Sequence, residues 1–129
     1  MKFILSFSLA SMLFCNLVDA APLTIVEEGE SRATIIIAAE TNAQQAAEGI
    51  QAYIKKMSGA ILDIVHEGQE EAVPAAGVRI YVGHTVAATD HGITIPTGFD
   101  SSIHDDAFEE EGYILKTKGN DIFIGGNSD

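Results

Sequence analysis

The run at residues 33–39, ATIIIAA, is the feature that most constrains the fold of this chain. A strand with one face toward water alternates apolar and polar side chains, whereas a strand covered on both faces is continuously apolar. Three consecutive isoleucines therefore predict a central strand that lies under a helix.

A long helix is predicted directly after this strand, at about residues 42–58. Its apolar side chains recur at steps of three and four, at Ala43, Ala46, Ala47, Ile50, Ile54 and Met57. Asn42 is expected to cap its first turn, and Lys55 and Lys56 complement the helix dipole in its last turn. Gly59 can adopt the left-handed conformation that ends a helix.

Short apolar runs elsewhere predict further strands, at residues 23–26, 61–65, 78–82, 113–117 and 122–124. The last two flank Gly119 and Asn120, which is typical of a hairpin. A short helix is expected at residues 85–90, with Thr85 as its cap and Gly92 after its end. Residues 67–77 and 93–106 are predicted to be loops.

The predicted fold is α/β, an α+β two-layer sandwich with a mixed sheet, one long helix and a short second helix. One long helix is too narrow to cover a face of a sheet of about five or six strands. The last predicted strand is followed by Gly125 and Gly126. A glycine-rich strand end of this kind usually leads into another element, commonly a helix. We therefore expect a closing helix that the given sequence lacks, and a chain that is the front of a longer protein.

Residues 1–20 have the three parts of a secretory signal peptide. Lys2 is the positive n-region, residues 3–18 are largely apolar, and Val18 and Ala20 suit a cleavage site after Ala20. A membrane anchor is the alternative, but this run is shorter than the roughly 20 apolar residues that span a bilayer. A lipoprotein signal at Cys15 is a second alternative, which the bulky Phe14 before it disfavours. Export to the periplasm or outside the cell is expected.

Cleavage there would leave one domain, residues 21–129, without a cysteine, and so without a disulfide, a thiol nucleophile or a thiolate metal site. The formal net charge is −12, and 47% of the residues are hydrophobic, which indicates a folded domain. A surface this acidic repels phosphate backbones and anionic membranes. We expect no nucleic-acid partner, and no membrane partner after signal cleavage.

No residue pattern predicts a catalytic, cofactor-binding or metal-binding residue. The four histidines, His66, His84, His91 and His104, are not paired at metal-ligand spacing. The acidic residues at 105–106 and 109–111 lack the pattern of a calcium loop and are interpreted as a solvated connector.

Other motifs of catalysis are also missing from the sequence. Gly119, Gly125 and Gly126 do not form a phosphate loop, and Ser58 and Ser128 have no nucleophile-elbow context. No pair of carboxylates stands out as a glycosidase pair. There is no tryptophan to stack on a sugar, and Tyr53, Tyr81 and Tyr113 are expected in the core or the sheet.

Three stretches resemble one known family in their order and spacing. Residues 46–60, AAEGIQAYIKKMSGA, resemble its helix end "A-x-x-L-x-x-Y-I-x-K-M-S-G-A", and ILDI at 61–64 resembles the strand after it. Residues 80–83, IYVG, with Thr85 resemble "I-x-V-G-x-T". Residues 111–117 and 120–126 resemble the hairpin "D-E-G-Y-x-I" and "N-D-I-x-I-x-G". The family is the N-terminal domain of α-glucuronidases, glycoside hydrolase family 67, which is similar to the domain before the barrel of β-N-acetylhexosaminidases.

The resemblance covers residues 23–126 and implies an accessory role. In the family a closing helix and a (β/α)₈ barrel follow the hairpin, and the barrel carries the catalytic carboxylates. No position here matches a catalytic residue, so none is carried over, and Tyr53 and Met57 are implied to be core residues. The partner implied is the chain's own missing catalytic barrel, in the degradation of polysaccharides such as xylan, without a cofactor.

Two other functions stay open at this point. One is a stand-alone carbohydrate-binding module with polysaccharide as its partner, and the other is an interaction domain of the cell envelope.

Export makes a direct prediction for the N-terminus of the secreted chain. Expression of all 129 codons in a secreting host should give a product that begins at Ala21. N-terminal sequencing or intact-mass spectrometry checks this, and a secreted product that retains Lys2 would contradict it.

Overall fold

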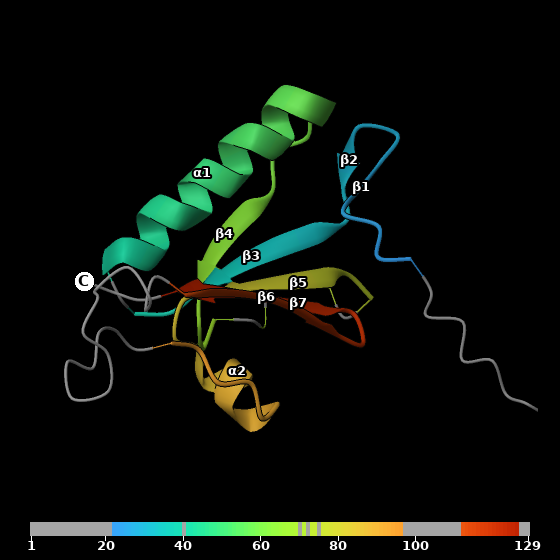
Figure 1. Ribbon diagram of the computed structural model, residues 1–129. Coiled ribbons are helices and arrows are strands. Elements are labelled where there is room, and N and C mark those ends of the chain that lie inside the picture. The colour runs from blue at the N-terminus through green and yellow to red at the C-terminus, as the bar shows by residue number, and fades with distance from the viewer. Residues whose placement is uncertain are drawn as a thin grey trace, which may run out of the picture.

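The computed structural model describes residues 22–39, 41–69, 71, 73–74, 76–96 and 112–126. In chain order the elements are β1 (Val26–Glu27), β2 (Glu30–Ser31), β3 (Ala33–Ile37), α1 (Thr41–Ser58), β4 (Asp63–His66), β5 (Val78–Val82), α2 (Val86–Asp90), β6 (Tyr113–Lys118) and β7 (Asp121–Gly126). Figure 1 shows α1 on one side of the main sheet and α2 on the other.

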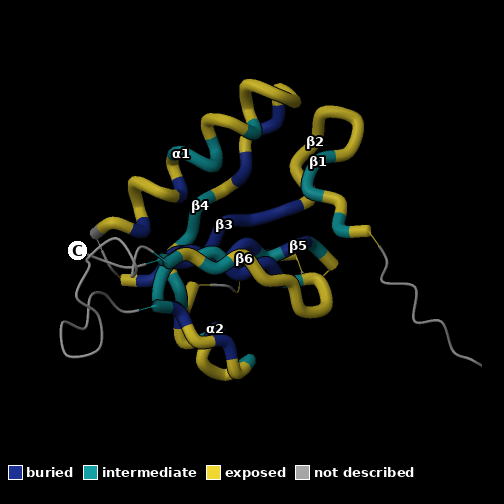
Figure 2. Tube along the Cα trace, viewed as in Figure 1, coloured by how far each residue is buried: buried dark blue, intermediate teal, exposed yellow. Residues whose placement is uncertain are grey.

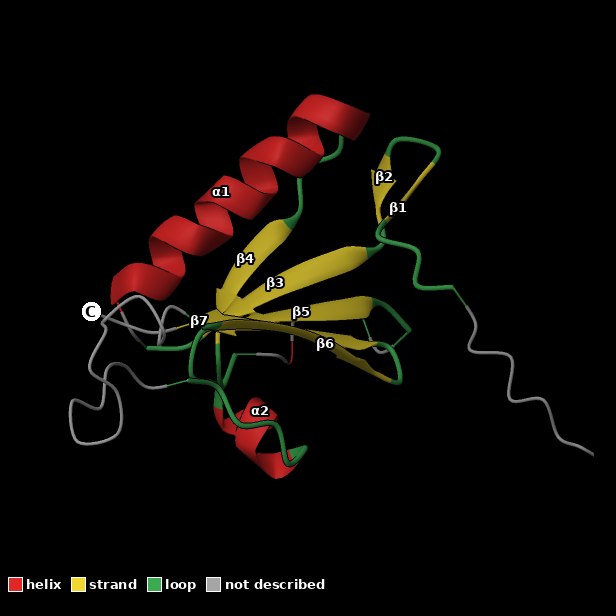
Figure 3. Ribbon diagram, in the orientation of Figure 1, coloured by secondary structure: helices red, strands yellow, loops and turns green. Residues whose placement is uncertain are grey.

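The main sheet has five strands in the order β4-β3-β5-β7-β6 (Figure 3). Strand β3 is parallel to both β4 and β5, and β5 is parallel to β7. Only β6 runs antiparallel, as the partner of β7 in the C-terminal hairpin. The mixed sheet with one long and one short helix confirms the predicted fold class.

A separate two-stranded hairpin, β1 with β2, precedes the main sheet. Its two turn residues, Glu28 and Gly29, have φ of 51° and 82°. Positive φ at both central residues is the type I′ turn whose twist matches that of a tight hairpin. The sequence predicted one strand at residues 23–26, but only Val26 of this run is a strand residue, and the strand that pairs with it, β2, was not predicted.

One face of the sheet packs against α1. Ile35, Ile37, Ile80 and Val82 of the central strands contact Ala43 and Ala47 of the helix, and all are buried. Ile50 and Ile54 continue the helix stripe and are partly buried against the same cluster. Alanine at the closest positions lets the helix axis approach the sheet.

The opposite face carries a smaller cluster beneath α2 and residues 93–95. It holds Ile36, Tyr81, Ala88, Ile95 and Phe123. The rings of Tyr81 and Phe123 stack with centroids 5.1 Å apart and planes 9° apart. A Cβ on Gly125 would come within 2.6 Å of Ile95, so this glycine lets Ile95 lie directly on the β7 backbone.

Several local predictions are confirmed. Residues 78–82 form a strand, Thr85 caps the short helix through a bond from Ala88 N to its side chain, and Lys55 and Lys56 lie in the last turn of α1. Gly59 has φ of 79° directly after α1. The hairpin around Gly119 and Asn120 is also present.

Two predictions about α1 were wrong. The helix begins at Thr41, so Asn42 lies within it and is not its cap. Tyr53 and Met57, expected in the core, are 69% and 78% exposed. Both lie in the last two turns of α1, Met57 in line with the sheet-facing stripe and Tyr53 on its flank, where no described element covers them.

Truncation of Phe123 should be costly, because its side chain is fully buried against Tyr81. Phe123→Ala is expected to lower the free energy of unfolding by about 3–5 kcal/mol. Urea denaturation followed by circular dichroism measures this change. The matched control is Tyr113→Ala on the neighbouring strand, whose side chain is 83% exposed and should cost less than about 1 kcal/mol. Equal losses for the two variants would contradict the described core.

Candidate functional site

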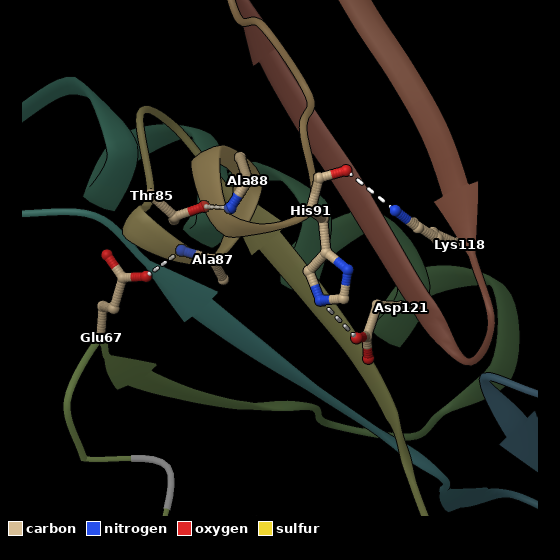
Figure 4. A network of polar contacts seen from close by, with 7 residues as sticks. All are labelled: Glu67, Thr85, Ala87, Ala88, His91, Lys118 and Asp121. Carbon is tan, nitrogen blue, oxygen red and sulfur yellow. Dashed lines mark hydrogen bonds and ion pairs between the residues drawn. The ribbon is translucent and has the colours of Figure 1, made fainter.

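The densest polar network described lies around α2, and its first part holds the start of that helix (Figure 4). Glu67 follows β4, and its two carboxylate oxygens accept hydrogen bonds of 2.9 Å from Val86 N and Ala87 N. The Thr85 hydroxyl accepts from Ala88 N at 3.2 Å. The three first-turn N–H groups, which lack helix partners, are therefore all satisfied.

The second part of the network holds the end of α2 to the C-terminal hairpin. His91 Nε2 lies 3.7 Å from Asp121 Oδ2, and the His91 ring is tilted against Phe123. Lys118 Nζ donates to the His91 carbonyl at 2.9 Å. These contacts link residues that are far apart in the chain. Each polar side chain of the network contacts another part of the protein, so the network holds α2 against the sheet.

A row of polar residues crosses the sheet on the α2 side. Paired residues of neighbouring strands share a face, and the register aligns Asp63, Thr34, Arg79, Asp121 and Lys118. Arg79 lies between Thr34 and Asp121, and its buried Nε has no hydrogen-bond partner. Opposite charges on adjacent strands stabilise a sheet, typically by about 0.2–1 kcal/mol per pair. The row is explained by sheet pairing without a catalytic role.

A cavity of about 530 Å³ opens at the carboxyl ends of β3 and β4 beside α2. Ile37, Val86 and Ala87 contribute apolar walls, and Glu67 and Asp90 contribute carboxylates. This edge of a parallel sheet is where α/β proteins commonly bind ligands. Both oxygens of Glu67 are nevertheless engaged by the backbone of α2, so the cavity offers no carboxylate pair for acid–base chemistry.

The residues considered from the sequence are scattered over the structure. His66 is exposed at the end of β4, and His84 is half-buried after β5. Ser58 Oγ donates to the Ile54 carbonyl and accepts from Ala60 N, so it ends α1. His104, Ser128 and the acidic residues at 105–106 and 109–111 lie outside the described residues.

The tyrosines divide into two groups. Tyr81 is buried in the sheet, as expected, whereas Tyr53 and Tyr113 are exposed. Sequence reasoning missed this exposure, and it also missed Glu67, which the sequence placed in a loop. A lone glutamate in a polar loop carries no local signal of a partner 19 residues away.

A groove of about 260 Å³ lies on the α1 side of the sheet, between the first turns of α1 and the C-terminal hairpin. Ala43 and Ala46 form its helix wall, and Val82, Ile124 and Tyr113 form its floor. Leu115, next to Ile124 in the register, extends the same surface and is 65% exposed. We call this surface the hairpin groove, and none of its lining residues carries an ionisable group other than the tyrosine hydroxyl.

The hairpin groove exists because one helix cannot cover five strands. Four strand spacings make the sheet about 19 Å wide, whereas a helix is about 10 Å across. Figure 2 shows the result, with buried residues along β3 and exposed or half-buried residues along β6. In the described part of the chain, Ile122 of β7 is buried in the cluster on this face, with Leu23, Ile25 and Val26 packed against that cluster, whereas Tyr113 and Leu115 of β6 have no cover.

The described residues contain no cluster of three or more His, Cys, Asp or Glu side chains that could bind a metal ion. In the same residues, no helix is long and apolar enough to cross a membrane. Comparison of the chain with models of known protein families, with curated proteins and with solved structures finds no match.

The Glu67 contacts make a specific stability prediction. Glu67→Gln keeps one acceptor oxygen but places an amide NH₂ against a backbone N–H, so it should lower the free energy of unfolding by about 1–3 kcal/mol. Chemical denaturation measures the loss, and amide exchange should accelerate at Val86 and Ala87. Exposed Glu71 on the same connection is the control, and Glu71→Gln should change stability by less than about 0.5 kcal/mol. Equal stability of both variants would contradict the role of Glu67.

Proposed function

We propose that this chain is the exported, non-catalytic N-terminal accessory domain of a carbohydrate-active glycoside hydrolase that resembles α-glucuronidases. Its role is to pack beside the catalytic barrel of the same protein, and it is the front part of that larger enzyme. The observation that carries the proposal is the hairpin groove, an apolar half-face that a folded domain needs to cover. Large exposed apolar surfaces mark interaction sites in soluble proteins.

The direction of β7 supports a closing helix in this groove. Strand β7 is parallel to β5, which is parallel to β3, and α1 follows β3 and returns over the sheet. A helix that followed Gly126 in the same way would lie beside α1, over β7 and β6. Axes of packed helices lie about 8–10 Å apart, which matches the width left uncovered. Tyr53 and Met57 would then lie along the contact between the two helices.

The polar groups also favour an accessory role over a catalytic one. The network around α2 is bonded internally, and the cavity beside it has its best carboxylate engaged by two backbone amides. Retaining and inverting glycosidases need two free carboxyl groups facing one cleft. In the proposal that pair belongs to the barrel, so the substrate is selected outside this chain.

The nucleotide sequence beyond codon 129 in the source genome tests the proposal most simply. We expect the reading frame to continue into an amphipathic helix and then into alternating strands and helices of a barrel with candidate carboxylates. A stop codon directly after Asp129, with a stably folded secreted product, would contradict it.

Enzyme assays on the 129-residue chain give an independent prediction. Hydrolysis of aryl α-glucuronides, aryl β-N-acetylhexosaminides and glucuronoxylan should stay at background, because the proposed catalytic residues are elsewhere. Turnover that survives repurification and disappears on substitution of Glu67 or Asp90 would overturn the proposal.

A stand-alone carbohydrate-binding domain is the second candidate, and the exposure of Tyr53 and Tyr113 is the observation that favours it. Exposed aromatic faces are suited to stack on sugar rings. Titration of the purified chain with xylan and chitin oligosaccharides distinguishes the two candidates. Saturable binding that Tyr113→Ala abolishes would favour this second function, and no binding is expected if the groove packs against protein.

A further inference from the structure

The cavity beside α2 lies where the connections between the strands reverse direction. The chain after β3 passes to α1 on one face of the sheet, whereas the chain after β5 passes to α2 on the other face (Figure 1). Strands β3 and β5 are adjacent and parallel, so the two connections separate at the carboxyl ends of these strands. In open α/β sheets such a topological switch point is where small ligands bind.

Hydrogen bonds join the segments that form the walls of this cavity. Ala38 N, just after β3, donates to the Val82 carbonyl at 3.1 Å. Glu67 N, just after β4, donates to the Ile37 carbonyl at 2.9 Å. The Glu67 carboxylate in turn accepts from the first amides of α2 (Figure 4). Because the walls are bonded to one another, the cavity is formed before a ligand enters, which lowers the cost of ordering on binding.

The lining of the cavity combines apolar walls with negative charge. Its volume of about 530 Å³ lies within the range of small-molecule sites, about 300–1,000 Å³. Ile37, Val86 and Ala87 supply the apolar walls. Glu67 and Asp90 supply two carboxylates, and no lysine or arginine lines the cavity among the described residues. The partners of Glu67 are neutral amides, so its charge has no counterion there.

We propose that this cavity binds a small organic cation, an ammonium or guanidinium group carried on an apolar body. The cationic group lies toward the carboxylates of Asp90 and Glu67, and the apolar body lies against Val86 and Ala87. The formal net charge of −12 adds a general attraction for cations. A neutral or anionic ligand of the same shape lacks the electrostatic part of this binding.

This binding does not depend on the proposed accessory function. The cavity and the hairpin groove share no lining residue. A ligand in the cavity therefore leaves the groove free for protein, and either proposal can fail without the other.

Titration of the 129-residue chain with benzylammonium, followed by NMR of the backbone amides, tests the site. Saturable shifts are expected at Gly68, Val86 and Ala87, with a dissociation constant on the order of 1–10 mM for a ligand of this size. Benzyl alcohol, which has nearly the same shape without the charge, should bind at least about fivefold more weakly. Benzoate should not bind in the cavity.

Two variants of exposed lining residues locate the binding. Asp90→Asn removes one carboxylate and should raise the dissociation constant for benzylammonium about fivefold. Val86→Lys, at a side chain that is 64% exposed, places a cation of the chain in the wall and should raise it at least about tenfold.

The matched control is Asp63→Asn, which makes the same charge change at the opposite end of β4. Asp63 is exposed and lies about 10 Å along the strand from His66 at the rim of the cavity. Salt screens exposed charges over such a distance, so this variant should leave the dissociation constant unchanged.

Three results would each overturn the proposal. They are the absence of saturable shifts at the cavity, binding of benzyl alcohol as tight as that of benzylammonium, and equal effects of Asp90→Asn and Asp63→Asn. Circular dichroism of each variant verifies that it is folded, and the comparison of the three ligands on the unmodified chain keeps the test decisive if a variant is not.

Discussion

Burial of β3 on both faces is the constraint on which the rest of the structure depends. Ile35 and Ile37 pack under α1, whereas Ile36 packs with Tyr81 and Phe123 on the opposite side. A strand of this composition must have cover on each face, since each buried isoleucine contributes about 1.5–3 kcal/mol that exposure would forfeit. The long helix supplies one layer, and α2 with residues 93–95 supplies the other. The network of Glu67, Thr85, His91 and Lys118 matters because it holds that second, smaller layer in place.

The same reasoning explains what could be predicted from the sequence. The continuous isoleucines, the Thr85 cap and the Gly119 turn are local signals, and the structure confirms each of them. Of the predicted helical stripe, Ala43, Ala47, Ile50 and Ile54 pack on the sheet, whereas Ala46 and Met57 are exposed. The exposure of Tyr53 and Met57 could not be predicted, because an apolar residue near the edge of a helical stripe is buried only if a neighbour exists there. The role of Glu67 at the start of α2 could not be predicted either. Its partners are the backbone amides of Val86 and Ala87, which are present whatever the side chains at those positions.

The uncovered half of the α1 face links the fold to the proposed function. Asp121 and Phe123 of β7 are fixed by contacts on the α2 side, so the hairpin is held in place without cover over Leu115 and Tyr113. The result is a floor of β-strand residues beside a helix wall, which is a suitable surface for a helix or domain that docks.

The measurement that tests the central claim most directly is the stability of the chain with and without the closing helix that the proposed function places after Asp129. Urea unfolding would compare the 129-residue chain with the same chain extended by the proposed closing helix, and amide exchange would be followed on β6 and β7. If the hairpin groove receives that helix, the extension should raise the free energy of unfolding by several kcal/mol and slow exchange more on β6 and β7 than on β3. Equal stability, with unchanged exchange on the hairpin, would contradict the account.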